Sequence, residues 1–216
     1  MFHISNNNIP TAPAYKTAQR DYNMNLNLKT WERNLSYASK IIALPGTSAF
    51  FYKLLIRQNW TKYKNSLACQ NVELGICNYC EDIDTISNTR HMFYDCSVAI
   101  KIWEIVTKLF KKSINFSLDQ SFEHLIFMQG KLPVNKNEKK AITDIHTVTL
   151  HSLQKIALAD TRLTEHSAIQ ILYRSIITTI YANKVVGRNE HIFEKIINSL
   201  PCCFKSINLL EVFNIS

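Results

Sequence analysis

Four residues that can bind a transition metal lie within the stretch "CNYCEDIDTISNTRHMFYDC". Three thiols and one imidazole follow the spacing C-x2-C-x10-H-x4-C. A two-residue gap allows one tight turn to direct two sulfurs at one point. The ten-residue excursion then returns the chain, so that a histidine and a third cysteine complete a tetrahedron. We therefore expect a metal site formed by Cys77, Cys80, His91 and Cys96.

This donor set favours zinc. Thiolates with one imidazole, and no evident redox demand, select Zn2+ over Ca2+ or Mg2+. The four ligands fill a tetrahedral site and leave no position for water, which predicts a structural site and not a catalytic one. Cys96 directly precedes a predicted helix, whose free N–H groups stabilise a thiolate. Residues 69–96 have little apolar content, so we expect them to need zinc for order. The alternative is that the cysteines pack as small apolar groups.

The composition is that of a globular, helix-rich protein. Of 216 residues, 46% are apolar and 11% aromatic, with only four Gly and five Pro. The net charge of +8 permits a nucleic-acid partner without establishing one. The sequence shows neither a secretory signal nor an apolar run of about 18 residues. We expect an intracellular protein, nuclear or cytoplasmic, with no membrane partner and with reduced cysteines.

Apolar residues at helical spacing predict a mainly α fold. Residues 1–24 show no periodicity and are interpreted as a flexible leader. The segment from Ser97 to Phe110 is apolar over more than half its girth, which predicts a central helix. We expect a helical domain over 25–116, with the zinc-stabilised loop inserted between helices, and a C-terminal helical bundle over 117–216. Further helices are predicted around residues 28–42, 47–58, 121–127, 142–156, 169–180 and 192–197.

A basic and aromatic segment precedes the cysteine cluster. It has no acidic residue between Phe51 and Leu67. This mixture suits a groove for single-stranded nucleic acid, in which cations follow phosphates and rings stack on bases. The alternative is a solvated helix face with both rings in the core. Arg90, beside His91, is a further candidate for a phosphate contact. The candidate residues of the segment are Lys53, Arg57, Trp60, Lys62, Tyr63 and Lys64.

Other potential ligands lack metal-binding spacing. His146, His151, Asp160 and His166 fall on separate helical turns, so we expect no second metal site there. Cys202 and Cys203 are adjacent, and packing is favoured for them because neighbouring cysteines rarely chelate one tetrahedral ion.

Read together, "FFYKLLIRQNW", "CNYC", "RHMFYDC" and "IKIW" resemble the zinc-binding region that lies downstream of the polymerase in non-LTR retrotransposon reverse transcriptases. The resemblance covers roughly residues 28–110, including "LKTWERNL", which is similar to the segment that opens this region. The excursion of ten residues is slightly longer than in the family, and "ISNTRH" stands where the family has Glu-Thr-x-Glu-His. The matching residues outside the four ligands are Tyr52, Lys53, Leu54, Leu55, Phe93, Ile102 and Trp103.

The resemblance implies a zinc-binding accessory domain, a fragment of a reverse transcriptase, that binds RNA or DNA. A polymerase domain is then a second expected partner. The chain has no Asp-Asp pair to hold two metal ions for nucleotidyl transfer, and no endonuclease constellation. We therefore expect no enzymatic activity and no small-molecule substrate. The alternatives are a zinc-stabilised structural or protein-interaction module without nucleic-acid binding, and a decaying transposon fragment.

Overall fold

The computed structural model describes residues 15–16, 19–20, 27–38, 40, 46–56, 58–80, 85–128, 132, 135–159, 161–187 and 190–201. Over these residues the fold is mainly α, as predicted, with the cysteine and histidine cluster between helices. Their only β-type pairing is an isolated antiparallel bridge between Ile76 and Ile86. The elements are α2 (Leu28–Ala38), α3 (Thr47–Leu55), α4 (Lys62–Cys69), η1 (Val72–Gly75), η2 (His91–Asp95), α5 (Ser97–Ile114), α6 (Phe122–Phe127), α7 (Lys136–Ala157), α8 (Glu165–Val185) and α9 (Glu190–Ser199).

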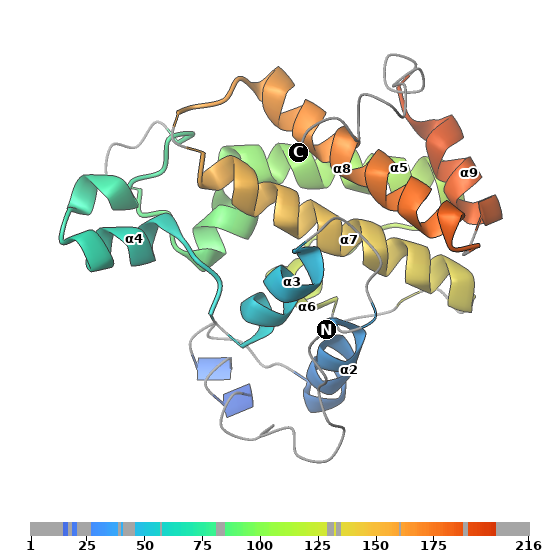
Figure 1. The fold of residues 1–216 in the computed structure, drawn as a ribbon, viewed down its shortest axis with the longest axis horizontal. Coiled ribbons are helices and arrows are strands. Elements are labelled where there is room, and N and C mark those ends of the chain that lie inside the picture. Colours follow the sequence, from blue (N-terminus) through green and yellow to red (C-terminus); the bar gives the residue numbers. More distant parts are fainter. Residues whose placement is uncertain are drawn as a thin grey trace.

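Helix α7 lies at the centre of the molecule, in contact with α3, α5, α8 and α9 (Figure 1). All ten residues from 141 to 150 are buried, although several are polar. The hydroxyls of Thr143, Thr147 and Thr149 each donate to the carbonyl four residues earlier, at 2.7–2.8 Å. These bonds satisfy the threonine hydroxyls inside the helix itself, which allows this part of α7 to be buried.

Helix α5 has the broad apolar face that its sequence predicts. Ile102, Trp103, Val106 and Phe110 are buried between α5 and its neighbours. The indole nitrogen of Trp103 donates to the Phe93 carbonyl at 2.8 Å, so the polar edge of this ring is also satisfied. The prediction that this helix belongs to the core is confirmed.

The basic segment does not form one continuous helix. The chain leaves α3 at Leu55 and begins α4 at Lys62. The Thr61 side chain is the N-cap of α4 and accepts from the Lys64 N–H at 3.1 Å. A helix over residues 62–69 is absent from the sequence-based prediction, and the basic and aromatic segment extends over α3, α4 and the residues between them. The local N-cap explains why helix restarts at this point.

Helices α4 and η1 form a lobe at the left of Figure 1. Between Leu55 and Met92, the described residues contribute only Cys77 and Tyr79 to the buried apolar core. The lobe is therefore attached to the helical body through the cysteine cluster more than through a hydrophobic interface of its own.

The structure describes only part of the predicted leader, and it does not test the predicted division between two domains. Of the predicted leader, the structure describes Tyr15, Lys16, Gln19 and Arg20, all in helical backbone. The Tyr15 ring lies 5.7 Å from the Trp31 ring. One hydrophobic cluster includes residues from Trp31 to Leu200. The division after residue 116 stays a prediction.

None of the helices in the described ranges combines the length and apolar character needed to cross a bilayer.

Replacing Gly75 with alanine should loosen η1 from α4. A Cβ at this position would lie 2.8 Å from the Ser66 Oγ and 3.0 Å from the Ser66 Cβ, closer than unstrained contacts allow. We expect Gly75→Ala to lower the free energy of unfolding by about 1–3 kcal/mol in chemical denaturation. The double variant Gly75→Ala with Ser66→Gly should recover much of this loss. A single variant as stable as the wild type would show that the contact is not restrictive.

Candidate metal centre

The structure brings the four predicted ligands together. The donor atoms of Cys77, Cys80, His91 and Cys96 all lie within 4.8 Å of one another. The Cys77 and Cys96 sulfurs are 3.8 Å apart, and the Cys80 sulfur lies 3.5 Å from the His91 Nε2. Tetrahedral zinc, with Zn–S near 2.3 Å and Zn–N near 2.0–2.1 Å, requires separations of about 3.8 Å and about 3.6 Å. These two separations therefore match those of a tetrahedral zinc site.

A short antiparallel pairing positions the first two ligands. The Cys77 N–H donates to the Thr85 carbonyl at 2.9 Å, and the Ser87 N–H donates to the Gly75 carbonyl at 2.8 Å. After this bridge the chain turns, and the Tyr79 N–H points at the Cys77 sulfur at 3.4 Å. A backbone N–H directed at the sulfur stabilises its negative charge. The C-x2-C turn is thus built around a thiolate.

A widened helical turn positions the other two ligands. His91 and Cys96 are five residues apart, which would place them about 140° apart around an ordinary α-helix. In η2 the chain instead forms a π-type turn, with the Cys96 N–H donating to the His91 carbonyl at 2.9 Å. The extra residue brings Cys96 back to the side of His91. Cys96 is then the N-cap of α5, as the sequence predicted.

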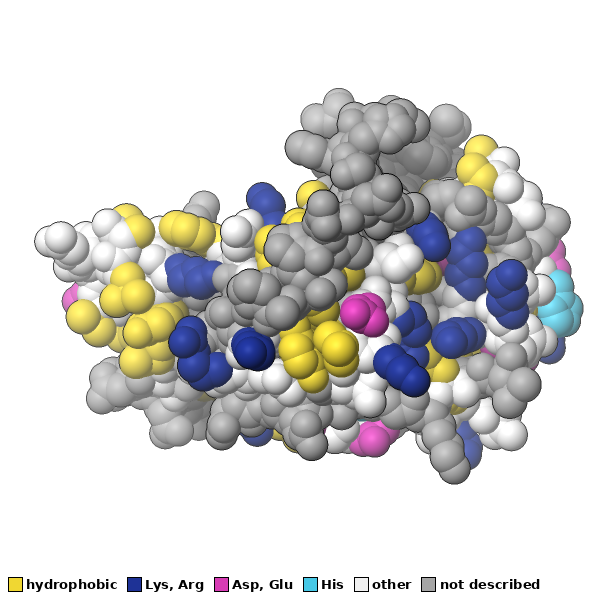
Figure 2. Space-filling view, turned by 90° about the horizontal axis from the view of Figure 1, so that it is seen from below, with side chains coloured by type: hydrophobic (Ala, Val, Ile, Leu, Met, Phe, Trp, Pro, Cys, Tyr) yellow, Lys and Arg dark blue, Asp and Glu magenta, His cyan; other side chains and the backbone are white. Residues whose placement is uncertain are grey.

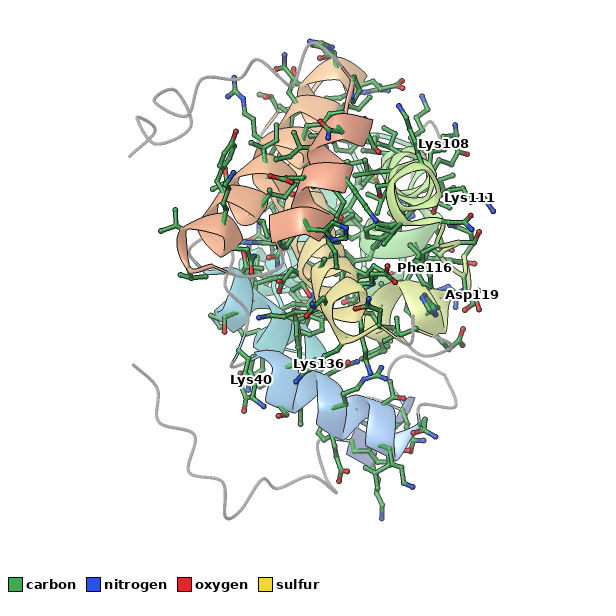
Figure 3. All side chains as sticks on the ribbon, turned by 90° about the vertical axis from the view of Figure 1, so that its right-hand side faces the viewer. Lys40, Lys108, Lys111, Phe116, Asp119 and Lys136 are labelled. Atoms are coloured by element: carbon green, nitrogen blue, oxygen red, sulfur yellow. The ribbon has the colours of Figure 1, made fainter. Side chains whose placement is uncertain are left out.

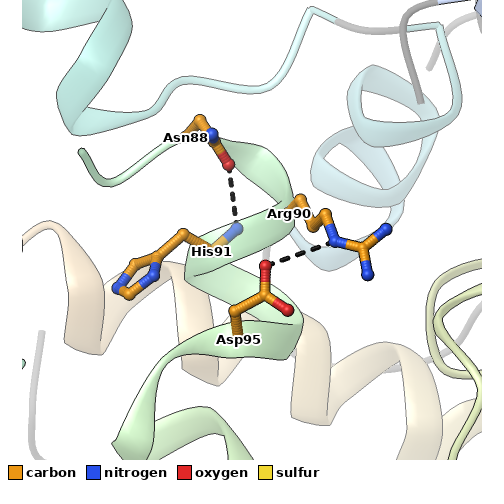
Figure 4. A network of polar contacts seen from close by, with 4 residues as sticks. All are labelled: Asn88, Arg90, His91 and Asp95. Atoms are coloured by element: carbon orange, nitrogen blue, oxygen red, sulfur yellow. Dashed lines mark hydrogen bonds and ion pairs between the residues drawn. The ribbon is translucent and has the colours of Figure 1, made fainter. Parts of the chain in front are cut away.

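Surrounding hydrogen bonds hold this turn and the C-x2-C turn in place. The Asn88 Oδ1 accepts from the His91 N–H at 2.9 Å, which fixes the start of η2 (Figure 4). The Ser97 hydroxyl donates to the Tyr79 carbonyl at 3.2 Å, which joins the two ligand pairs.

Tyr79 ties the site to the helical body. Its hydroxyl donates to the Ile156 carbonyl at 3.1 Å, at the end of α7, and accepts from the Leu163 N–H at 3.3 Å, just before α8. Burial raises the pKa of this phenol, so it stays protonated and able to donate. The sequence analysis missed Tyr79, because its position inside the CNYC turn gives no signal of a distant hydrogen-bond partner.

The thiols are close enough to influence one another. The hydrogen bond with Cys96 is the main cause that lowers the pKa of Cys77, while the same bond and burial raise the pKa of Cys96. Two buried sulfurs in contact resist a second negative charge unless a cation lies between them. A divalent ion supplies that charge and displaces the remaining proton.

The site is enclosed. Cys77, His91 and Cys96 are buried, and Cys80 is half-buried. Four protein ligands complete a tetrahedral shell, so a bound ion would have no open position for water or substrate. The arrangement can hold a metal and clamp the chain around it, and it offers no route to metal-assisted catalysis at this point.

The residues predicted to contact nucleic acid have diverse environments. Lys53 is exposed on α3, whereas Lys62 and Lys64 are half-buried on α4. The Lys64 ammonium donates to the Asn59 carbonyl at 2.7 Å, so it also stabilises the turn before α4. Arg57 lies outside the described residues.

The two rings of this segment are not in the core, contrary to the alternative interpretation. Trp60 is 49% exposed and Tyr63 is 40% exposed, whereas Trp31 and Trp103 are each 1% exposed. The molecule therefore presents two aromatic rings to solvent beside the lysines of α4.

Arg90 is engaged in local contacts. Its Nε lies 3.3 Å from a carboxylate oxygen of Asp95 (Figure 4), and its guanidinium lies 5.3 Å and 4.8 Å from the ring centres of Tyr94 and Phe122. This geometry explains its position beside η2. A phosphate contact of Arg90 stays a prediction.

No other group of three or more potential metal ligands occurs in the described part of the chain. His146 is fully buried, its Nε2–H donates to the Leu125 carbonyl at 2.7 Å, and its ring centre lies 5.3 Å from that of Trp103. Burial lowers the pKa of His146 to about 3, so it is a neutral core residue. Asp160, Cys202 and Cys203 lie outside the described residues.

Comparisons with models of protein families, with curated proteins and with solved structures found no match to this chain. The class of the protein is therefore described from its fold and its site. It is a helical protein with a buried Cys3His site suited to a metal ion such as zinc.

Purified protein should contain one zinc ion per chain. Cys77→Ser and Cys96→Ser should each lose the metal, because a hydroxyl replaces a required thiolate. The matched control is Cys69→Ser, since Cys69 is an exposed free cysteine outside the cluster. Elemental analysis with a thiol-metal colour assay gives the stoichiometry. Equal zinc content in Cys77→Ser and Cys69→Ser would contradict the assigned ligands.

Removing the Tyr79 hydroxyl should weaken the attachment of the site without emptying it. Tyr79→Phe leaves the Ile156 carbonyl and the Leu163 N–H without this partner, at a cost of about 1–3 kcal/mol in unfolding free energy. Zinc content should stay that of the wild type. Tyr52→Phe is the control, because Tyr52 is 40% exposed on α3. Equal stability of the two variants would refute the anchoring role.

Proposed function

We propose that this chain is a zinc-stabilised accessory module that binds single-stranded RNA or DNA and catalyses no reaction itself. The observation that carries the proposal is the exposure of Trp60 and Tyr63 on a lobe attached through the Cys3His site. Burial of an aromatic ring stabilises a fold, and this chain buries its other two tryptophans. An exposed pair of rings beside lysines is suited to stacking on bases while cations contact phosphates.

The zinc site supports this proposal through its position. Its first two ligands follow α4 and η1 in the chain, so a bound metal would hold this end of the lobe and help to fix the direction in which Tyr63 faces. The Gln154 side chain also donates to the Trp60 carbonyl at 3.0 Å, which ties the backbone of this ring to α7. A ring held by its backbone is better ordered for stacking than one on a free loop.

The resemblance to the zinc-binding region of non-LTR retrotransposon reverse transcriptases leads to the same class of ligand. We propose that the module belongs with such a polymerase and positions RNA or target DNA for it. The order of motifs supports this proposal: a Tyr-Lys-Leu-Leu helix, the C-x2-C pair, the H-x4-C pair and the Trp103 helix.

A second candidate function is protein interaction, because the lobe also exposes large apolar side chains. At the left-hand end of Figure 2, hydrophobic side chains gather on the surface of this lobe. Exposed apolar residues in one region are typical of docking surfaces. These residues are Leu67, Val72, Leu74 and Ile86, which are 61%, 76%, 40% and 46% exposed.

Ring deletion distinguishes the two functions. In fluorescence anisotropy with labelled oligo(U) RNA and oligo(dT) DNA, Trp60→Ala and Tyr63→Ala should each weaken binding by about 1–3 kcal/mol, or roughly 5- to 150-fold. Leu67→Ala is the matched control, because it removes an exposed apolar side chain from α4, the helix that carries Tyr63. Quenching of tryptophan fluorescence should report mainly on Trp60, since Trp31 and Trp103 are buried. Absence of wild-type binding at low salt would reject the proposal and favour protein interaction.

A further inference from the structure

A hollow of about 450 Å³ lies between α2 and the N-terminal part of α7, away from the metal centre. Figure 2 views the molecule from the side of α2 and shows Lys and Arg side chains gathered on the right-hand part of this face. None of the residues that line the hollow is acidic. Its cationic lining residues are Arg33, Lys40, Lys136, Lys139 and Lys140.

Of the carboxylates on α7, Glu138 lies between Lys136 and Lys139 in the sequence but does not line the hollow. Asp144 is fully buried and accepts a hydrogen bond from the Tyr37 hydroxyl. Like charges around one hollow repel one another, and their repulsion is relieved when an anion enters. The cationic residues that line the hollow therefore favour a negatively charged ligand.

Arg33 is the most constrained cation of the group. Its Nη2 donates to the Met128 carbonyl at 2.9 Å, which fixes the guanidinium against the base of the hollow. Burial lowers the pKa of Arg33, which reflects the incomplete hydration of its charge. An incompletely hydrated guanidinium gains more from an anionic partner than a solvated one does.

The lining suits an extended chain of phosphates better than one small anion. Two of its lysines, Lys40 and Lys136, are exposed on opposite walls, one just after α2 and one at the start of α7. Figure 3 labels both lysines on the α2 side of the molecule, and both line the hollow. A single small anion is usually held by convergent buried donors. Spaced, solvent-exposed cations are typical of contacts with a nucleic-acid backbone.

We propose that this α2–α7 hollow binds the phosphate backbone of a nucleic-acid strand. This inference rests on the nucleic-acid binding proposed above and adds a second contact region to it. The two regions lie apart in Figure 1, with α4 at the left and the N-terminal end of α7 at the right. The rings of the lobe would contact bases, and the hollow would contribute affinity that is independent of sequence.

Charge reversal at the two walls tests the inference on the zinc-loaded full chain. The variant Lys40→Glu with Lys136→Glu is compared with Lys108→Glu with Lys111→Glu, which changes the net charge equally on α5. Figure 3 shows Lys108 and Lys111 on α5, away from Lys40 and Lys136. Glutamate in the first turn of α7 complements the helix dipole, so the fold should tolerate it. Circular dichroism and zinc content verify this for both variants.

The probe is labelled oligo(U) RNA, titrated at several salt concentrations. We expect the hollow variant to bind on the order of 10-fold more weakly, with a slope of log Kd against log salt lower by about 1.4, or about 0.7 per lost contact. The α5 variant should keep the wild-type slope.

The outcomes separate this inference from the proposed function. Equal losses in both charge-reversal variants would overturn the inference, because they would reflect net charge alone. RNA binding that depends on Trp60 and Tyr63 but not on Lys40 and Lys136 would overturn it and leave the proposed function intact. A wild-type chain that binds inorganic tripolyphosphate but no RNA would overturn the assignment to nucleic acid and the proposed function together.

Discussion

The attachment of the α4 lobe depends on the convergence of three thiols and one imidazole. Between Leu55 and Met92 the described chain buries only Cys77 and Tyr79 as apolar core residues, which is too little to order such a segment by hydrophobic burial. Three thiols brought close together, two of them buried and one half-buried, add no comparable stabilisation by themselves. A metal bound by them would contribute on the order of 10 kcal/mol, enough to replace the missing core. Metal binding would therefore explain both the low apolar content of this segment and the convergence of its four donor atoms.

The helical body depends instead on hydrophobic burial, and the polar groups of its central helix must be satisfied there. Residues 141–150 of α7 are buried, so the threonine hydroxyls there bond to carbonyls of the same helix and His146 stays neutral. The metal centre contacts the helical body where the Tyr79 hydroxyl forms hydrogen bonds at the end of α7 and just before α8. This contact is polar and specific, which suits a junction that has little apolar area available.

The sequence predicted the features that depend on local spacing. Apolar periodicity indicated α5, α7 and α8, and ligand spacing indicated all four residues of the cluster. It could not predict features formed by residues that are remote along the chain. The π-type turn that aligns His91 with Cys96 has no simple periodic signal, and α4 begins at a single threonine cap. The cationic hollow combines Arg33 with Lys136, and neither of its walls is unusual alone.

The separation of these features has a consequence for how the molecule would bind a strand. Tyr63 belongs to the lobe attached through the metal site, Trp60 lies just before that lobe, and the cationic hollow belongs to the helical body. Under the proposed function, loss of metal would weaken base stacking, at Tyr63 first, and would leave the proposed phosphate contacts of the hollow in place. A closed structural metal would in this way affect base stacking without contacting the nucleic acid. In this proposal the metal orders the surface that stacks on the bases, whereas the cationic residues that line the hollow do not depend on it.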